Sequence, residues 1–391
     1  MGNKLKLVSF SIIYFMMLFQ FGTDLYLPSF PEITKVLSTT DAYVQLTLSV
    51  FLFGFAISQL IYGPLSDRYG RKIFILGGMI LFFLATSLGA LSDNIYWLLT
   101  ARLFQGLGAG AGSVIARAMM KDCFSGVALE KLASAQGIIW SFIPMIAPVF
   151  GSYLQKYLGW RSNFYVLGIF ILIAVILAAL LPETNVNKLE KINFSKIISN
   201  YKHILSNKKY IAYALCPVCI IAMNISFSTI APFLFQQGYG LSVVSYGWII
   251  LFIAISFVIG NVLNRILLNK IESYKLINYG ALIVISINSL LFITTIFNSR
   301  PNLIVLIFLI IMVWVGSSLV YSNCAAQVMH IFPELAGSSA AIFGCMVFIG
   351  GMLGSAIVTN LPNTSLWGFA PLALLAGIVM FISSSIANRT V

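Results

Sequence analysis

Long apolar runs, each bounded by charged or turn-forming residues, follow one another along almost the whole chain. Each is about 20 residues long, the length that an α-helix needs to cross the hydrocarbon core of a bilayer. The runs are unbroken, whereas a membrane β-barrel alternates apolar and polar residues. The pattern predicts an all-α polytopic membrane protein with twelve spans, near residues 7–28, 42–62, 73–92, 95–118, 131–155, 163–181, 210–233, 243–264, 275–297, 301–325, 334–360 and 366–386.

The composition excludes the soluble classes. Of 391 residues, 60% are hydrophobic and only 9% are charged, against roughly 25% charged residues in a typical soluble domain. Four of the five cysteines lie within apolar runs, where they act as small hydrophobic residues, so no disulfide framework is expected. A soluble enzyme, a disordered chain and a secreted disulfide scaffold are therefore excluded.

The net charge of +12 reflects topology. If the N-terminus is placed inside, eighteen of the 23 lysines and arginines fall in inside segments, Arg102 lies within a span, and four fall outside: Lys35, Lys156, Arg161 and Arg300. Such a bias sets the orientation of membrane proteins. We therefore expect both termini to be cytoplasmic and the basic loops to face a lipid bilayer, with no nucleic-acid partner.

A polar connection at 182–209 separates six spans from six, which predicts bundles at 1–181 and 210–391. Within the connection, apolar residues recur at helical spacing among lysines: Phe194, Ile197, Ile198, Tyr201, Ile204 and Leu205. Two interpretations stay open, a basic amphipathic helix on the inner leaflet and a solvated linker with incidental periodicity.

The two halves repeat one another weakly. The string Gly63…Asp67-Arg68 recurs 197 residues later as Gly260…Asn264-Arg265, again between the second and third spans of its half. Internal repeats of this kind are typical of transporters, which bind substrate where the repeats meet. The sequence therefore predicts two pseudo-symmetric six-helix bundles.

Asp24 and Arg102 are charged residues inside predicted spans, where a charge costs about 2.5–3.5 kcal/mol on insertion scales. Arg102 lies roughly 10 Å from the outer end of its span, and Asp24 lies at a similar depth. The two side chains can meet, which would make the carboxyl a tunable proton site. The alternatives are an interfacial, structural Asp24 and an Arg102 that binds helix backbone.

The loop between the second and third spans holds Gly63, Asp67, Arg68, Gly70 and Arg71. Glycines allow a sharp turn, and Asp67 can cap a helix or pair with a base on a neighbouring helix. The arrangement predicts a conformational latch rather than a substrate site.

Small residues and prolines mark two further spans. Gly106, Gly108, Gly110 and Gly112 form faces with a small residue at every fourth position, which let helices touch closely. Pro144 and Pro148, with Gly137 and Gly151, mark a fifth span with freed backbone carbonyls. Packing alone accounts for such glycines as well as function does.

These strings resemble the motifs of the major facilitator superfamily. Residues 63–72 resemble its signature loop, and 102–106 resemble its fourth-helix motif. Residues 137–151 resemble the fifth-helix motif of proton-coupled antiporters, although Ala147-Pro148 stands where that motif usually has Gly-Pro. That substitution is common in the Bcr/CflA drug-resistance family, which other stretches also resemble: 24–31, 117–122, 159–164, 181–184, 232–242, 323–325 and 336–340.

The resemblance implies a twelve-helix exporter in a bacterial cytoplasmic membrane that exchanges protons for lipophilic compounds. It makes Asp24 the carboxyl that couples proton and substrate, and Arg102 its partner. It assigns a gate network and conformational motif to Gly63, Asp67, Arg68, Gly70, Arg71, Arg117, Asp122, Gly137, Pro144, Pro148 and Gly151.

The cargo is expected to be a lipophilic, often cationic small molecule, because only one buried base is available to bind a substrate carboxylate. Polar and aromatic residues within spans supply candidate contacts: Tyr26, Gln105, Asn224, Phe227 and Gln236. The proton is the expected coupling ion, with no metal, other cofactor or catalytic residue, and a monomer is expected. The alternatives are an importer or narrow metabolite exporter, for example of an amino acid or siderophore, and a non-transporting receptor or scaffold.

Overall fold

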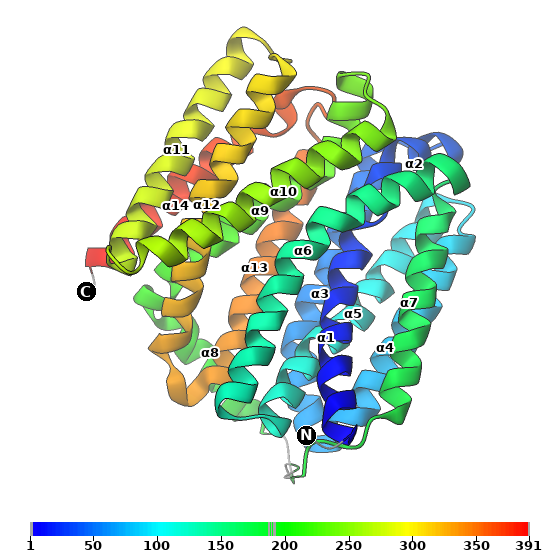
Figure 1. Cartoon of the computed structure of the whole chain (residues 1–391), viewed down its shortest axis with the longest axis vertical. Helices are drawn as coiled ribbons and strands as arrows, with labels where there is room; N and C mark the ends of the chain where they lie inside the picture. Colours follow the sequence, from blue (N-terminus) through cyan, green and yellow to red (C-terminus); the bar gives the residue numbers. More distant parts are fainter. Residues whose placement is uncertain (1–2, 187, 189, 191–192, 390–391) are drawn as a thin grey trace. The chain divides into compact units, whose positions relative to one another are not determined.

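The computed structural model describes residues 3–186, 188, 190 and 193–389, and within them it is all-helical without strands. The chain divides into two compact units, residues 1–194 and 195–391. The first contains α1 (Asn3–Asp24), η1 (Leu27–Ser29), α2 (Phe30–Val36), α3 (Asp41–Tyr69), α4 (Arg71–Leu91), α5 (Ile95–Cys123), α6 (Gly126–Leu158) and α7 (Arg161–Leu180). The predicted all-α class is confirmed (Figure 1).

The second unit contains α8 (Phe194–Ser206), α9 (Lys208–Phe233), the π-helical turn η2 (Leu234–Gly238), α10 (Val243–Leu267), α11 (Ser273–Phe297), α12 (Leu303–Ile331), η3 (Pro333–Leu335), α13 (Ala336–Val358), η4 (Leu366–Gly368) and α14 (Ala370–Arg389). A long helix lies in each of the twelve predicted spans, but the first prediction, 7–28, was too long: α1 ends at Asp24, where the chain breaks before η1. The amphipathic stretch of the polar connection is the helix α8.

Eleven helical segments among the described residues are long and apolar enough to cross a membrane. The remaining long helix, α5, carries Arg102 and four glycines, which lower its mean hydropathy. Yet α5 is largely buried and packs most extensively against α3 and α4, with α1 alongside. Because neighbouring helices cover α5, its own surface can be less apolar than that of a helix that faces lipid.

Side chains close the ends of several helices. Thr40 accepts a hydrogen bond from the Tyr43 N–H at the start of α3, and Asn94 accepts two at the start of α5. Ser242 and Asn302 cap α10 and α12 in the same way. Such caps satisfy donors that the first helical turn leaves unpaired.

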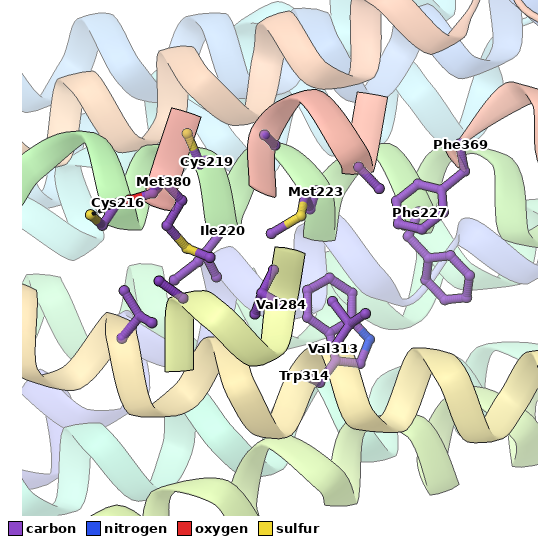
Figure 2. Close-up of a cluster of buried hydrophobic side chains, with 14 of the residues drawn as sticks. Cys216, Cys219, Ile220, Met223, Phe227, Val284, Val313, Trp314, Phe369 and Met380 are labelled. Atoms are coloured by element: carbon purple, nitrogen blue, oxygen red, sulfur yellow. Dashed lines mark hydrogen bonds between the residues drawn. The ribbon is translucent and has the colours of Figure 1, made fainter. Parts of the chain in front are cut away.

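The core of the second unit is built around α9, which packs against α13, α14 and α12. Figure 2 shows its buried side chains, with Cys216, Ile220 and Met223 following one another along α9. Phe227 continues this row and meets the ring of Phe369 at 5.4 Å between centroids. Burial of these side chains among helices, rather than against lipid, holds the unit together.

Candidate functional site

The end of α1 is the first part of the site. The helix stops at Asp24, and the chain continues through η1 and α2, each with a proline in its first turn. Because proline lacks an N–H and restricts the residue before it, Pro28 and Pro31 interrupt a single continuous helix here. Asp24 is left partly exposed at the break, while the Tyr26 side chain is buried.

Arg102 on α5 is fully buried beside this break. Its Nη1 donates to the carbonyl oxygen of Gly22 at 2.9 Å and to Gln105 Oε1 at 2.7 Å. Its guanidinium lies over the rings of Tyr26 and Phe51, with Cζ 4.2 Å from each centroid. Aromatic faces attract a desolvated cation, so these two rings stabilise the buried charge.

No ion pair joins Asp24 to Arg102 within 4.0 Å in the described part of the chain. Arg102 instead binds helix backbone, as the structural alternative anticipated. Its Nε and Nη2 have no hydrogen-bond partner among the described residues. The site therefore holds a buried cation with two spare donors and a partly exposed carboxyl that is not ion-paired with it.

A buried hydrogen-bond chain extends from Arg102 across the bundle. Gln105 Nε2 donates to Thr86 Oγ1 at 2.8 Å, and Thr86 donates to the Phe82 carbonyl at 2.7 Å. The Tyr26 hydroxyl lies 3.0 Å from Thr47 Oγ1. The candidate substrate contacts Tyr26 and Gln105 are thus both immediate neighbours of Arg102, and the chain ties α1, α3, α4 and α5 to one another.

The candidates in the second unit occupy different environments. Phe227 is buried in the aromatic cluster with Phe369, and with Trp314 at 6.4 Å (Figure 2). Asn224, three residues earlier on α9, is exposed, and Gln236 is partly exposed in the π-helical turn. Phe227 therefore has a packing role, whereas Asn224 on α9 and Gln236 in η2 are at least partly exposed.

The α3–α4 turn, where the sequence predicts a latch, is organised around Arg71. Its guanidinium pairs with Asp67, with Asp122 Oδ2 at 2.9 Å, and with Ser66 Oγ at 2.8 Å. Gly70 has φ +106°, a conformation that side-chain-bearing residues rarely adopt. The structure brings together Asp67, Arg71 and Asp122 at the ends of α3, α4 and α5.

Two other predicted members make different contacts. Arg68 stacks on the ring of Tyr69 at 4.8 Å. Arg117 on α5 donates to Gln59 Oε1 on α3, within the two helices rather than at the turn. Gly63 has open space where a side chain would lie, so no close approach requires a glycine there.

Glu183 is a member of the latch that the sequence did not reveal. Its carboxylate accepts the N–H of Arg71 at 2.9 Å and that of Lys72 at 3.3 Å, so it caps α4 from a segment about 110 residues away. Asn185 donates from its amide to the Asp67 carbonyl at 2.9 Å. The sequence offered one indication: α4 begins after Gly70, which has no side chain to cap the helix, so a cap must come from elsewhere.

Removing the Glu183 charge is expected to destabilise the protein in a pH-dependent way. Partial burial raises the pKa of this carboxyl, but three backbone N–H donors and the Lys188 charge lower it by more. A carboxyl whose pKa is lower in the folded state stabilises that state above its unfolded pKa, and the contribution is lost as pH falls through the folded pKa. The melting temperature of Glu183→Gln should therefore lie below wild type at pH 7, and the gap should begin to narrow below about pH 4 and close once the pH is below the lowered folded pKa.

Glu190→Gln is the matched control, because Glu190 is an exposed carboxyl of the same connection. It should melt like the wild type throughout. A Glu183→Gln gap that persists unchanged to pH 3 would show that the charge is not what stabilises the turn.

The second unit has an uncharged counterpart of the latch. Asn323 Nδ2 donates to Asn264 Oδ1 at 2.7 Å, and Ser273 Oγ donates to Asn323 Oδ1 at 3.0 Å. Both asparagines are buried. The weak repeat thus places amides and a hydroxyl at the ends of α10, α11 and α12, where the first unit has an ion-paired arginine.

Glycines set the close contacts of the first unit. A Cβ on Gly106 would overlap the Phe51 carbonyl of α3, and one on Gly110 would overlap Ser58. Gly108 faces the other way, where a Cβ would lie 2.6 Å from the Phe82 nitrogen of α4. The small faces of α5 therefore allow α3 and α4 to approach on opposite sides.

The fifth-span motif lies on α6, with Pro144 and Pro148 inside the helix. A Cβ on Gly151 would overlap the Leu25 carbonyl at the α1 break, whereas Gly137 has open space around it. Of the motif residues, Gly151 is the one whose size positions the chain beside Asp24.

Membrane-length helices in two repeated units, with a buried arginine and a carboxyl at a broken helix, define a polytopic membrane transporter of the repeat type. A family model described as Major Facilitator Superfamily matches residues 10–355. The chain belongs to the major facilitator superfamily, whose members in these comparisons are transporters and not enzymes.

Relatives cover nearly the whole chain. It is 33% identical to the uncharacterized MFS-type transporter YdgK of Bacillus subtilis, over 93% of this chain and 89% of that protein. It is 26% identical to a bicyclomycin resistance protein homolog of Haemophilus influenzae, over 94% and 92%. Among solved structures, a D-xylose-proton symporter shares the fold with a TM-score of 0.77 at 15% identity, over 97% of this chain and 98% of that one.

Proposed function

We propose that the protein is a proton-coupled antiporter that exports lipophilic, often cationic small molecules from a bacterial cell. The observation that carries the proposal is the partly exposed Asp24 carboxyl at the broken end of α1, beside an arginine that binds helix backbone and aromatic rings instead of this carboxyl. A carboxyl not committed to an ion pair can bind either a proton or a cationic ligand. The resistance name of a full-length relative supports export of such compounds.

The proposed cycle is alternating access between the two units. Facing the cytoplasm, deprotonated Asp24 favours loading of the compound. Facing outward, protonation of Asp24 removes the charge and favours release, and the protonated form returns. Each proton that enters contributes about 2.3 kcal/mol per 100 mV of membrane potential, in addition to the pH gradient.

Arg102 has a positioning role in this cycle. The Tyr26 and Phe51 rings and the Gly22 carbonyl hold its charge in place without the help of Asp24. The Gly22 bond also fixes α1 two residues before the carboxyl. Among the candidate contacts, Asn224 is exposed and Gln236 is partly exposed, whereas the Tyr26 ring is buried against Arg102 and would act on the compound through that contact.

The proposed setting is the bacterial cytoplasmic membrane, with both termini and the α3–α4 turn on the cytoplasmic side. The excess of basic residues in the segments assigned to that side supports this orientation. The proton is the only coupling ion proposed, and a single chain is proposed to be the transporting unit.

Energised inside-out vesicles test the proposal. Lumen pH is followed while a panel of lipophilic cations and neutral drugs is added, with Asp24→Asn vesicles as control. We expect compound-triggered proton release in the wild type and none in Asp24→Asn. No release across the panel would contradict multidrug export and favour a narrow metabolite transporter, whereas release that survives in Asp24→Asn would remove Asp24 as the proton carrier.

A further inference from the structure

We infer that α8 is a docking surface for anionic phospholipid, seated at the membrane interface on the side of its helix that the second unit does not cover. The sequence left an interfacial helix and a solvated linker equally open. The structure divides the apolar side chains of α8 into two sets with different surroundings.

One set faces protein. Ile204 is fully buried and Tyr201 packs against the same core of the second unit. The His203 ring contacts the Phe332 ring at 5.3 Å between centroids. These contacts attach α8 to the second unit and fix its rotation about its own axis.

The other set is exposed. Phe194, Ile198 and Leu205 are 63%, 53% and 48% exposed, and their spacing places them along one side of the helix. In a solvated linker, three large apolar side chains along one side of a helix would be exposed to water, which is unfavourable. Burial of that row in the acyl boundary is favourable, as for other interfacial helices.

The charge beside this row matches an anionic headgroup. The helix α8 contains two lysines, Lys196 and Lys202, and no acidic residue, and Lys208 and Lys209 follow it at the start of α9. An open hollow of about 540 Å³ runs along α8 next to the row, lined by Ser195, Ile198, Ser199 and Lys202. Two hydroxyl groups and an ammonium beside an apolar side chain suit a lipid phosphate whose acyl chains lie toward Ile198.

The inference rests on the proposed orientation, which puts α8 on the cytoplasmic leaflet, but it does not depend on what the protein transports. The full chain, with Cys123→Ser to remove the partly exposed thiol, is spin-labelled at Ile198→Cys or at Ser199→Cys. The two labels lie on adjacent residues and point about 100° apart around the helix. Each is placed in nanodiscs of phosphatidylglycerol or of phosphatidylcholine, and its collisions with O₂ and with a water-soluble nickel chelate are measured.

In phosphatidylglycerol we expect the ratio of O₂ to nickel collisions to be several-fold higher for the label at 198 than for the label at 199. Equal ratios would overturn the inference, and so would a label at 198 that neither reagent reaches, because protein would then cover the row. In phosphatidylcholine, or with Lys202→Gln in phosphatidylglycerol, the difference should shrink at least twofold. No dependence on lipid charge would overturn the headgroup part.

A separate measurement distinguishes a wrong orientation from a wrong inference. An impermeant maleimide should modify Ser199→Cys in inside-out vesicles and not in right-side-out vesicles. The reverse result would contradict the proposed topology while the nanodisc ratios still report whether α8 contacts lipid.

Discussion

Arg102→Lys is expected to reduce compound-triggered proton release by about tenfold or more, equivalent to at least about 1.4 kcal/mol. The planar guanidinium lies over two rings and donates to two acceptors. The ammonium of lysine is a compact point charge and cannot make both ring contacts and both hydrogen bonds at once. The Gly22 bond, which fixes α1 near Asp24, is the contact most sensitive to the change. The measurement is the vesicle assay, with a melting curve of the purified variant.

Arg102→Leu should destabilise the first unit further. It leaves the Gly22 carbonyl and Gln105 Oε1 buried without a donor, at about 1–3 kcal/mol each. It also removes the cation that lies over the Tyr26 and Phe51 rings, worth up to about 2 kcal/mol in a desolvated site. The loss of melting temperature should therefore be larger for leucine than for lysine.

Arg161 provides a matched control. It also donates to a backbone carbonyl, that of Ser92 at 2.8 Å, and stacks on a ring, that of Trp160 at 4.4 Å. It is only partly buried, so water can replace what Arg161→Lys loses. Equal effects of the two lysine substitutions would contradict a special role for Arg102, as would wild-type transport by Arg102→Lys.

The spans could be predicted from the sequence because the bilayer imposes a length and an apolar composition on each helix. Helix ends could not. α3 continues to Tyr69 and α12 to Ile331, several residues past the predicted spans, because polar ends of helices outside the hydrocarbon carry no apolar signal. The helical pattern of α8 was visible, but which side faces protein depends on Ile204 meeting a core assembled from distant segments.

The candidate site could be predicted in part, because charges are costly inside spans and so Asp24 and Arg102 stand out. Their relation could not be predicted. The depths of Asp24 and Arg102 along their helices allow an ion pair, but side-chain packing decides whether one forms. Here the rings of Tyr26 and Phe51 lie against the guanidinium. The contact of Glu183 with Arg71 could not be predicted either, because it joins residues that are about 110 positions apart in the chain.

The two latches differ in what they respond to. The charged cluster is centred on Arg71, whose side chain is only 8% exposed, so salt screens its pair with Asp122 weakly, whereas the Asn264–Asn323 pair carries no charge. High salt should therefore weaken mainly the contact of Asp67, whose side chain is 43% exposed, and leave the Asn264–Asn323 pair unchanged. The α10–α11 turn also carries an ion pair, Lys275–Glu272 at 3.0 Å, so charge is not confined to the first unit.

Gly151→Ala is expected to lower transport strongly, whereas Gly137→Ala is expected to leave it unchanged. Both glycines lie on α6 and belong to the same predicted motif. An added methyl at 151 overlaps the Leu25 carbonyl, which is backbone and cannot rotate away, so the α1 break must move. Overpacking of this kind costs typically about 1–3 kcal/mol, and here the displaced peptide adjoins Asp24.

At Gly137 the same methyl enters open space. Alanine within a helix is favoured over glycine by about 0.5–1 kcal/mol, so Gly137→Ala should melt at or slightly above the wild-type temperature. Vesicle transport and melting curves of the two variants give the comparison. If Gly137→Ala impaired transport as much as Gly151→Ala, α6 would need the flexibility of its glycines rather than the close contact at Leu25, and the motif would act through bending of the helix instead of through the position of Asp24.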